Sequence, residues 1–364
     1  MQIQLLRNGT KVQKLLHTLD SLYTVELVKK YQVDKYIKKF QTTDLLKICV
    51  LFVLSKAEYL HEFLQMLYEK KYIAKKFGIS SVCIQQVYKA LQNRNHDFFR
   101  ELFTQTLEFV KQDVPRSFYL KFKHIYLLDS TFMQYCLARV FFSSFGYSST
   151  LSKIVRGVKL HTLYDLSKDC IEKVKITGGK YHDSPQADSL LKDLKNCIVI
   201  FDKAYHQIKR FKQLDENNVL FVIPLRADIT IKEKLTIEIE AGEQMITITH
   251  GMMSNGLKVI LVKTPEITLV SNAVNCNWYE LVVLYQLRTH IEVFFRMLKQ
   301  EMKIRQPNLR NHNSILSLTY IILLVFTLLR WMSKIDTLFS ERLPRIRTKL
   351  ANAIRAMCEL KRDS

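Results

Sequence analysis

The chain has 364 residues, enough for two domains or for one large domain with appendages, and its 48% content of hydrophobic residues excludes general disorder. Lysine and arginine outnumber aspartate and glutamate by 55 to 34, for a net charge of +21. This surplus favours a polyanionic partner, most commonly nucleic acid, although ribosomal and membrane-surface proteins share the bias.

The seven cysteines are scattered and include no Cys-x-x-Cys pair, which argues against a zinc ribbon and a disulfide framework. Their odd number, and an N-terminus without a signal-peptide pattern, predict reduced thiols in a cytoplasmic protein. Residues 313–329 carry no charge, but this segment is barely long enough to span a bilayer and contains Asn, Ser and Thr. We therefore expect a buried core helix there and no membrane partner.

Residues 1–118 are predicted to form a helical N-terminal region, because apolar residues recur at helix-like spacing and Gly and Pro are scarce. The segment 78–81, Gly-Ile-Ser-Ser, followed by residues 82–93 resembles the turn and second helix of a helix-turn-helix. A helical hairpin with a serine cap has the same pattern. This region and the basic tail 336–364, with a helix over 345–361, are candidates for DNA binding and dimer contacts, or are simply solvated surface.

From residue 119 the pattern changes to short apolar runs, which predict an α/β domain with a mixed sheet over 119–335. Asp183-Ser-Pro predicts a helix start with Asp183 as the cap, leading into 186–195. The first strand is expected to end at Asp129, the next two to complete a meander, and the fourth to end at Asp202 before another helix. These four strands are predicted at 122–128, 158–164, 171–176 and 197–201.

A β-rich insertion is predicted over 219–275, where five strand-like runs are separated by turn signals. Helix is expected to resume near Asn277 and to continue past Lys303. The five runs are 219–224, 235–240, 244–250, 257–262 and 266–270.

The strongest chemical signal lies in residues 284–300, which are predicted to form one helix. At about 100° per residue, five polar side chains then share a narrow stripe opposite an apolar face. Salt bridges from Glu292 to residues four positions away would explain part of this pattern. The whole stripe is more typical of a surface that meets phosphates beside a metal ion. Its members are Tyr285, Arg288, Glu292, Arg296 and Lys299.

Two aspartates, Asp129 and Asp202, each follow an apolar strand, where an open α/β sheet usually displays its active site. A buried carboxylate needs a compensating cation or hydrogen bonds. Together with Glu292 the two would supply the hard oxygen ligands that Mg²⁺ prefers. Either aspartate taken alone is more typical of a strand-end cap or a turn residue.

Other acidic and histidine residues fit structural roles better. Asp165 and Asp169 flank a predicted hairpin turn, Asp183 fits a helix cap, and Glu280 falls among the apolar positions of its helix. Glu301 lies on the same helix without matching a motif. The isolated histidines, expected to be structural, are His161, His182 and His206.

These motifs resemble a known family. The spacing Tyr285-x2-Arg288-x3-Glu292-x6-Lys299 matches the Y-R-E-K signature of DDE transposases of insertion sequence family four. The segments Leu-Leu-Asp129-Ser-Thr and Val-Ile-Phe-Asp202-Lys-Ala-Tyr resemble its first and second acidic motifs. The likeness covers residues 120 to 330.

The resemblance implies a ribonuclease-H-like fold with a β-strand insertion, in which Asp129, Asp202 and Glu292 hold two Mg²⁺ ions, or Mn²⁺ in their place, about 4 Å apart. It implies metal-dependent cleavage of double-stranded DNA at terminal inverted repeats and strand transfer into target DNA. It also implies a synaptic homodimer, located with the nucleoid of a bacterium. The basic and tyrosine members of the stripe would contact phosphates near the scissile bond.

Departures from the family leave one step open. Thr289 stands where Trp often follows the arginine, and no Trp falls within 219–275. Trp278, Phe221 or no residue at all could stack a flipped base during hairpin formation. Two alternatives to a transposase also remain: a ribonuclease-H-like nuclease that cuts without joining, and a domesticated DNA-binding protein whose catalytic site has decayed.

Overall fold

A computed structural model describes residues 2–23, 25–55, 57, 59–79, 83–113, 122–134, 147–150, 153–227, 229–241, 244–301, 309 and 311–335. The chain divides into two compact units. The helical unit comprises Met1–Val114, Met133–Val158 and Met297–Ser364, and the sheet unit comprises Pro115–Phe132 and Lys159–Arg296. By its packing, α12 (His312–Ile335) groups with the N-terminal helices.

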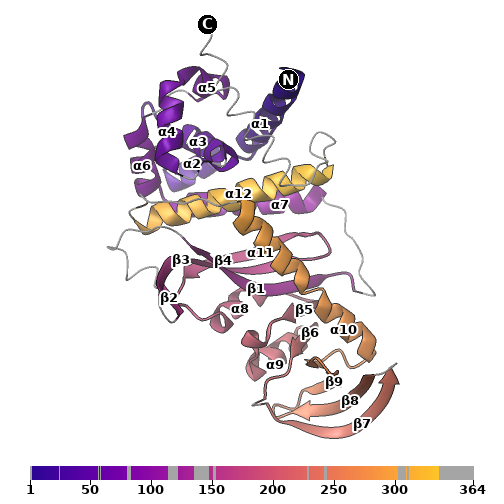
Figure 1. Ribbon diagram of the computed structural model, residues 1–364. Coiled ribbons are helices and arrows are strands. Elements are labelled where there is room, and N and C mark those ends of the chain that lie inside the picture. Colours follow the sequence, from indigo (N-terminus) through magenta and orange to yellow (C-terminus); the bar gives the residue numbers. More distant parts are fainter. Residues whose placement is uncertain are drawn as a thin grey trace. The chain divides into compact units, whose positions relative to one another are not determined.

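The helical unit is built around α12, which packs along α7 and also contacts α6 and α3 (Figure 1). Its helices are α1 (Gln2–Leu22), α2 (Val25–Tyr31), α3 (Thr42–Ser55), α4 (Leu60–Glu69), α5 (Lys71–Lys76), α6 (Ile84–Asn93), α7 (His96–Asp113) and α12 (His312–Ile335). The predicted helical character of the N-terminal region is confirmed over the residues that the structure describes. The predicted helix over 345–361 lies outside them.

Among the described helices, α12 is long and apolar enough to cross a membrane, but 94% of its most apolar window is buried in the protein. The predicted core helix is therefore confirmed. Its polar residue Asn313 has a structural reason: Nδ2 donates to the carbonyls of Leu91 and Arg94 at the end of α6, and Oδ1 accepts from the His96 N–H at the start of α7. One amide thus satisfies helix-end groups that would otherwise lack partners.

The predicted turn at Gly78 closes α5. Gly78 adopts φ +67°, and the N–H groups of Gly78 and Ile79 donate to the carbonyls of Lys75 and Ala74, which is a Schellman motif. Glycine suits this position because it reaches positive φ without steric cost. The serine cap predicted at 80–81 lies outside the described residues.

The sheet unit has a ribonuclease-H-like arrangement with a mixed sheet, as predicted (Figure 1). The strand order is β3-β1-β5-β6-β10-β9-β8-β7, and β4 also pairs with β3. Strand β2 (Tyr147–Thr150) pairs antiparallel with the first residues of β3, and both segments belong to the helical unit. The other strands are β1 (Ile125–Gln134), β3 (Lys153–Asp165), β4 (Cys170–Gly178), β5 (Cys197–Phe201), β6 (Val219–Pro224), β7 (Ile231–Ala241), β8 (Gln244–Met253), β9 (Lys258–Lys263) and β10 (Thr268–Ser271).

Strands β1, β5 and β6 are parallel neighbours, whereas β10, β9, β8 and β7 extend the sheet from β6 by antiparallel pairing. All five strands predicted over 219–275 are present, and the meander of β1, β3 and β4 is confirmed. Every residue of β5 is buried, as expected for a parallel strand covered on both faces. Helix α9 (Ile208–Glu216) covers β6, with the rings of Phe211 and Phe221 stacked 4.4 Å apart.

Two local predictions are corrected. Strand β1 does not end at Asp129 but continues to Gln134. Helix α8 (Ser184–Leu191) begins as predicted, yet Asp183 does not cap it, because its backbone is already helical (φ −72°, ψ −43°). The Asp183 carboxylate instead lies 3.2 Å from Lys159 Nζ and 3.4 Å from His161 Nδ1.

Candidate active site

The two predicted aspartates lie on neighbouring strands. β1 and β5 are parallel, and Leu128 is in register with Phe201. Asp129 follows Leu128 and Asp202 follows Phe201, so the two aspartates occupy equivalent positions along the paired strands. Because adjacent strands of a sheet lie about 4.8 Å apart, the two residues are neighbours. Asp202 follows the end of β5, as predicted, whereas Asp129 lies within β1 and reaches the same place by register alone.

The predicted single helix over 284–300 is broken into two. α10 (Trp278–Gln286) begins with a capping box between Asn277 and Glu280, and α11 (Thr289–Glu301) follows after a turn at Leu287 and Arg288. In this turn the N–H groups of residues 288, 290 and 291 donate to carbonyls three residues earlier. The Thr289 hydroxyl donates to the Gln286 carbonyl at 3.0 Å, which satisfies one backbone group freed at the break.

Helix α11 is held by its apolar side. Ile291 and Phe294 are buried, and the Phe294 ring lies 5.0 Å from that of Tyr164 on β3. Glu292 lies on the other side of α11, with its side chain 43% exposed. Burial of this face, at ~2 kcal/mol for each large apolar side chain, anchors the carboxylate at the sheet.

The guanidinium of Arg288 gathers all three predicted acidic residues. Its Nη1 lies 3.4 Å from Asp202 Oδ2 and 3.7 Å from Asp129 Oδ2, and its Nη2 lies 2.5 Å from Glu292 Oε1. Because one guanidinium spans only a few ångströms, the three carboxylates converge on one place in the sheet unit. The Arg288–Glu292 pair expected from helical spacing is present, but it is one part of a larger group. We call this group of Asp129, Asp202, Arg288 and Glu292 the Arg288 cluster.

In this cluster the guanidinium of Arg288 occupies the space between the three carboxylates. In the described part of the chain no three His, Cys, Asp or Glu side chains are close enough to one another to hold a metal ion. Three carboxylates nevertheless present hard oxygen donors to a positive charge that lies among them. A metal ion that binds these oxygens must therefore displace the guanidinium.

Asp129 is the most constrained of the three carboxylates. Burial raises its pKa to about 6, although the Ser130 N–H, which donates to Oδ1 at 2.7 Å, and Arg288 both oppose this shift. Only 19% of its side chain is exposed, against 42% for Asp202. Burial thus disfavours the ionised form of Asp129 in the metal-free protein, and a cation of higher charge than Arg288 would favour it.

We expect Asp129→Asn to stabilise the metal-free protein at pH 7. Since the folded protein binds the Asp129 proton more tightly than the unfolded chain, the free energy of unfolding falls as pH rises from about 4 to about 6. Removing the carboxylate should recover at most about 3 kcal/mol above that range and nothing near pH 4. Thermal unfolding in EDTA at pH 4 and at pH 7 checks this result, and a lower Tm for Asp129→Asn at pH 7 would contradict it.

The other predicted phosphate contacts lie around or beyond the cluster. The Tyr285 ring centroid is 5.9 Å from Arg288 Cζ, and burial raises the tyrosine pKa. Arg296 is exposed one turn after Glu292 on α11, and in the described residues it forms no ion pair with Glu292. Lys299, also exposed, lies two turns after Glu292 on the same helix.

Tyr205, in the short helix η2 (Lys203–Tyr205) after Asp202, was not predicted as a site residue. It is buried, and burial, followed by the charges of Asp129 and Asp183, raises its pKa far above the usual value. Its place in the Asp202-Lys-Ala-Tyr motif was visible in the sequence, but its proximity to Asp129 depends on the sheet.

The remaining acidic residues keep structural roles. Asp165 accepts the Lys168 N–H at 3.2 Å, and Asp169, at φ +52°, accepts a hydrogen bond from the Tyr164 hydroxyl. Both belong to the β3–β4 turn, as predicted. His161 is buried, its Nε2 lies 2.8 Å from Thr177 Oγ1, and burial lowers its pKa to about 4. None of these groups joins the Arg288 cluster.

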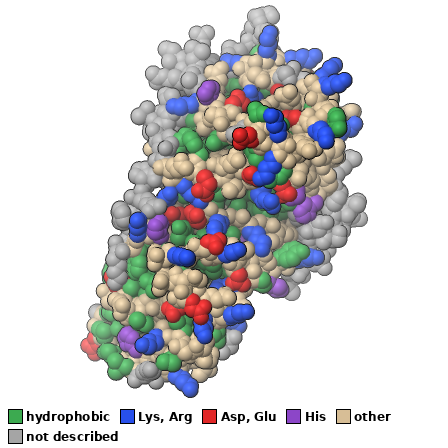
Figure 2. Space-filling model, turned by 180° about the vertical axis from the view of Figure 1, so that it is seen from behind, with side chains coloured by type: hydrophobic (Ala, Val, Ile, Leu, Met, Phe, Trp, Pro, Cys, Tyr) green, Lys and Arg blue, Asp and Glu red, His purple; other side chains and the backbone are tan. Residues whose placement is uncertain are grey.

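Charge on the surface is less localised than in this cluster. Lys and Arg side chains are spread over the face shown in Figure 2, with Asp and Glu side chains among them. The net charge of +21 therefore does not by itself identify a binding site, and each basic group must be judged by its neighbours.

Comparison with known proteins agrees with this arrangement. The family described as "Transposase DDE domain" matches residues 120–328. Over 188 residues the chain is 25% identical to the "Probable transposase for insertion sequence element IS5377" of Geobacillus stearothermophilus, covering 48% of this chain and 49% of that protein. Over 197 residues it is 26% identical to the "Putative transposase y4zB" of Sinorhizobium fredii (strain NBRC 101917 / NGR234), covering 50% and 55%.

The chain thus spans about half the length of these curated relatives. The family match, however, covers more than half of this chain and includes the whole Arg288 cluster. On the strength of that match and of the ribonuclease-H-like sheet on which three carboxylates converge, the chain belongs to the DDE transposase family.

Proposed function

We propose that this chain is a DNA transposase that cuts insertion-sequence ends and transfers the freed strand into target DNA. The observation that carries the proposal is the convergence of Asp129, Asp202 and Glu292 on one guanidinium in a ribonuclease-H-like sheet. Three carboxylates far apart in sequence would repel one another without a compensating cation, so a fold that assembles them indicates a use for them. The Y-R-E-K spacing supports a member of insertion sequence family four.

The family requires a divalent metal ion, and the donor set fits one. Asp129, Asp202 and Glu292 offer the hard oxygen ligands that Mg²⁺ prefers, and we propose Mg²⁺, or Mn²⁺ in its place, as the ion that they hold. When bound, such ions activate water and stabilise the leaving oxygen of a phosphodiester. The guanidinium now among the carboxylates marks where positive charge is favoured.

The residues of the site then have distinct tasks. The three carboxylates bind the metal in their ionised form, which for Asp129 means above its pKa of about 6 in the metal-free protein. Arg288, released from them, is free to donate to a phosphate near the scissile bond, with Tyr285 packed beside it. Arg296 and Lys299 extend the same side of α11 and are proposed to contact the next phosphates.

The proposed substrate is double-stranded DNA with terminal inverted repeats, followed by target DNA as the acceptor. The helical unit, which contains the N-terminal helices, is proposed to bind the repeats. Together with the basic tail 336–364, it is proposed to support a synaptic homodimer. The proposed location is the cytoplasm of a bacterium. Phe221 is fully buried in the core of the sheet unit, so its ring offers no face to a flipped base. Trp278, half-buried at the start of α10, remains the better candidate for hairpin formation.

A cleavage and joining assay tests the proposal. We expect the wild-type chain to cut a labelled duplex copied from the repeats that flank its gene, in Mg²⁺ but not in EDTA, and to join the product to a plasmid. Lys299→Ala should weaken cleavage and binding of the repeat by about tenfold without lowering Tm, because its side chain is exposed. Cutting without joining would indicate a nuclease instead, and binding without cutting would indicate a decayed DNA-binding protein.

A further inference from the structure

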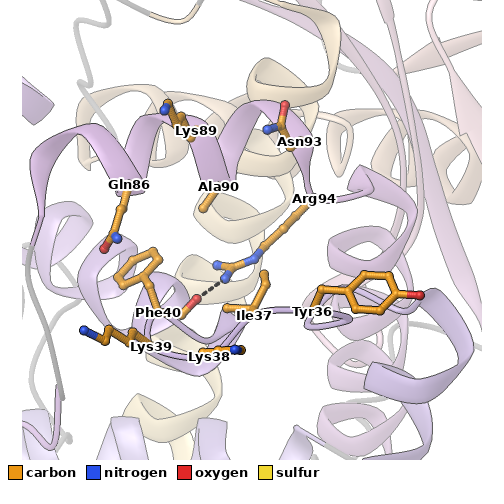
Figure 3. Close-up of a pocket in the computed structure, with 10 residues that line it drawn as sticks. All are labelled: Tyr36, Ile37, Lys38, Lys39, Phe40, Gln86, Lys89, Ala90, Asn93 and Arg94. Atoms are coloured by element: carbon orange, nitrogen blue, oxygen red, sulfur yellow. Dashed lines mark hydrogen bonds between the residues drawn. The ribbon is translucent and has the colours of Figure 1, made fainter.

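A pocket of about 530 Å³ lies in the helical unit between α6 and the loop of residues 32–41 that joins α2 to α3 (Figure 3). Its apolar part consists of Ile37, Phe40 and Ala90. Its polar part includes three lysines and two amides. These are Lys38, Lys39, Lys89, Gln86 and Asn93.

The loop is held in place by a buried ion pair. Arg94, 4% exposed, lies 3.5 Å from Asp34 Oδ1 and donates to the Phe40 carbonyl, the contact drawn in Figure 3. Asp34 also accepts the N–H and hydroxyl of Thr42 at 2.8 and 2.7 Å, and the Tyr23 hydroxyl at 3.1 Å. The backbone that carries the pocket's lysines is therefore pre-organised, which reduces the entropy that a ligand must overcome.

Tyr36, at the edge of the pocket, is the most unusual residue of the loop. Its side chain is 90% exposed and its backbone adopts φ +64°, a conformation that bulky residues rarely take. Lys35 Nζ lies 5.3 Å from the ring centroid. An exposed aromatic ring in an unfavourable backbone conformation contributes little to folding, and such strain is typical of binding sites.

The three kinds of lining group match the three parts of a nucleotide. Exposed lysines bind phosphate, and the amides of Gln86 and Asn93, seven residues apart on the exposed side of α6, can bind base edges. The apolar part and the Tyr36 ring can hold a base or sugar. An acidic peptide would use the lysines but would leave the amides and the aromatic ring without a role.

We propose that this pocket, the Lys38 pocket, binds one unpaired nucleotide of a DNA strand. The lysines Lys38, Lys39 and Lys89 hold its phosphates, and Tyr36 stacks on its base. This inference rests on the proposed function and adds to it a strand contact outside the acidic site. A paired base is already stacked within its duplex, so the pocket should prefer single strands.

Fluorescence anisotropy in EDTA tests the lysines, using a fluorescein-labelled single-stranded oligonucleotide of mixed sequence and the matching blunt duplex. Replacing Lys38, Lys39 and Lys89 together by alanine should reduce the slope of log K against log salt for the single strand by about 1.4, since two phosphates flank one nucleotide of a strand and each neutralised phosphate contributes about 0.7. The matched control replaces three exposed lysines of the same unit, Lys29, Lys75 and Lys76. An equal loss of slope in the control would show only a general charge effect and would overturn the pocket.

Tyr36→Gly separates binding from folding. Because glycine adopts positive φ readily, this variant should keep or raise the wild-type Tm while binding the single strand about tenfold more weakly, whereas Tyr36→Phe should bind normally. A fall in Tm, unchanged single-strand binding or an equal loss for the duplex would each overturn the proposal. If pocket variants bind as wild type does while wild type still cuts the flanking repeats, the pocket fails and the transposase function stands.

Discussion

Asparagine at Asp129 or Asp202, or glutamine at Glu292, is expected to reduce metal-dependent cleavage by at least about a hundredfold. Each substitution removes one ionised oxygen ligand from the place where the three carboxylates converge on Arg288. Binding of the duplex should survive or tighten slightly, because a negative charge near the phosphates has been removed. Cleavage and binding of the same labelled duplex, measured in parallel, check both halves of the expectation.

The matched control is Glu238→Gln on β7, which makes the same chemical change at an exposed position outside the Arg288 cluster. It should cut as wild type does. Retained cutting by any one of the three cluster variants would remove that residue from the metal site. Loss of binding together with cleavage would instead indicate that the substitution damages the fold.

Arg288→Gln should lower the Tm of the metal-free protein by several degrees and increase the stabilisation that Mg²⁺ provides. Without the guanidinium, three carboxylates repel one another, and the loss should be about 2 kcal/mol after allowance for partial solvent exposure. A metal ion then binds without displacing a competing cation, so it stabilises the variant more than the wild type. Thermal unfolding in EDTA and across a Mg²⁺ titration measures both effects.

Cleavage by Arg288→Gln should nevertheless fall, because the proposed phosphate contact is lost. Arg288→Lys keeps the positive charge but lacks the planar guanidinium, so its rate of cleavage should lie between those of the wild type and Arg288→Gln. For the Mg²⁺ stabilisation, though not for cleavage, Arg296→Gln is the matched control on α11, since this exposed arginine forms no ion pair with Glu292 in the described residues. Equal Mg²⁺ stabilisation of wild type and Arg288→Gln would refute the idea that the guanidinium occupies the metal position.

The raised pKa of Asp129 shows that the Arg288 cluster lowers the stability of the metal-free protein. A carboxyl whose pKa is raised to about 6 by burial destabilises the folded chain at neutral pH, and the same burial strengthens its attraction to a divalent ion. Stability in the absence of metal and strength of metal binding are therefore expected to change in opposite directions among variants of Asp129.

Much of the sheet unit was predictable from local pattern. The buried run of β5, the five strands over 219–275 and the start of a helix near Asn277 follow from neighbouring residues alone, because apolar patterns act over a few positions. The spacing from Tyr285 to Lys299 likewise predicts the helical segment that carries Glu292.

Only the tertiary structure decided how those parts meet. Asp129 lies in mid-strand and reaches Asp202 through the β1–β5 register, which depends on a pairing between segments more than seventy residues apart. The break at Leu287 and Arg288 replaced the predicted continuous stripe, and it is from this turn that Arg288 reaches all three carboxylates. The sequence by itself determined which groups could serve as ligands, since that depends on side-chain chemistry; their convergence depends on backbone hydrogen bonds between distant segments, which no local pattern encodes.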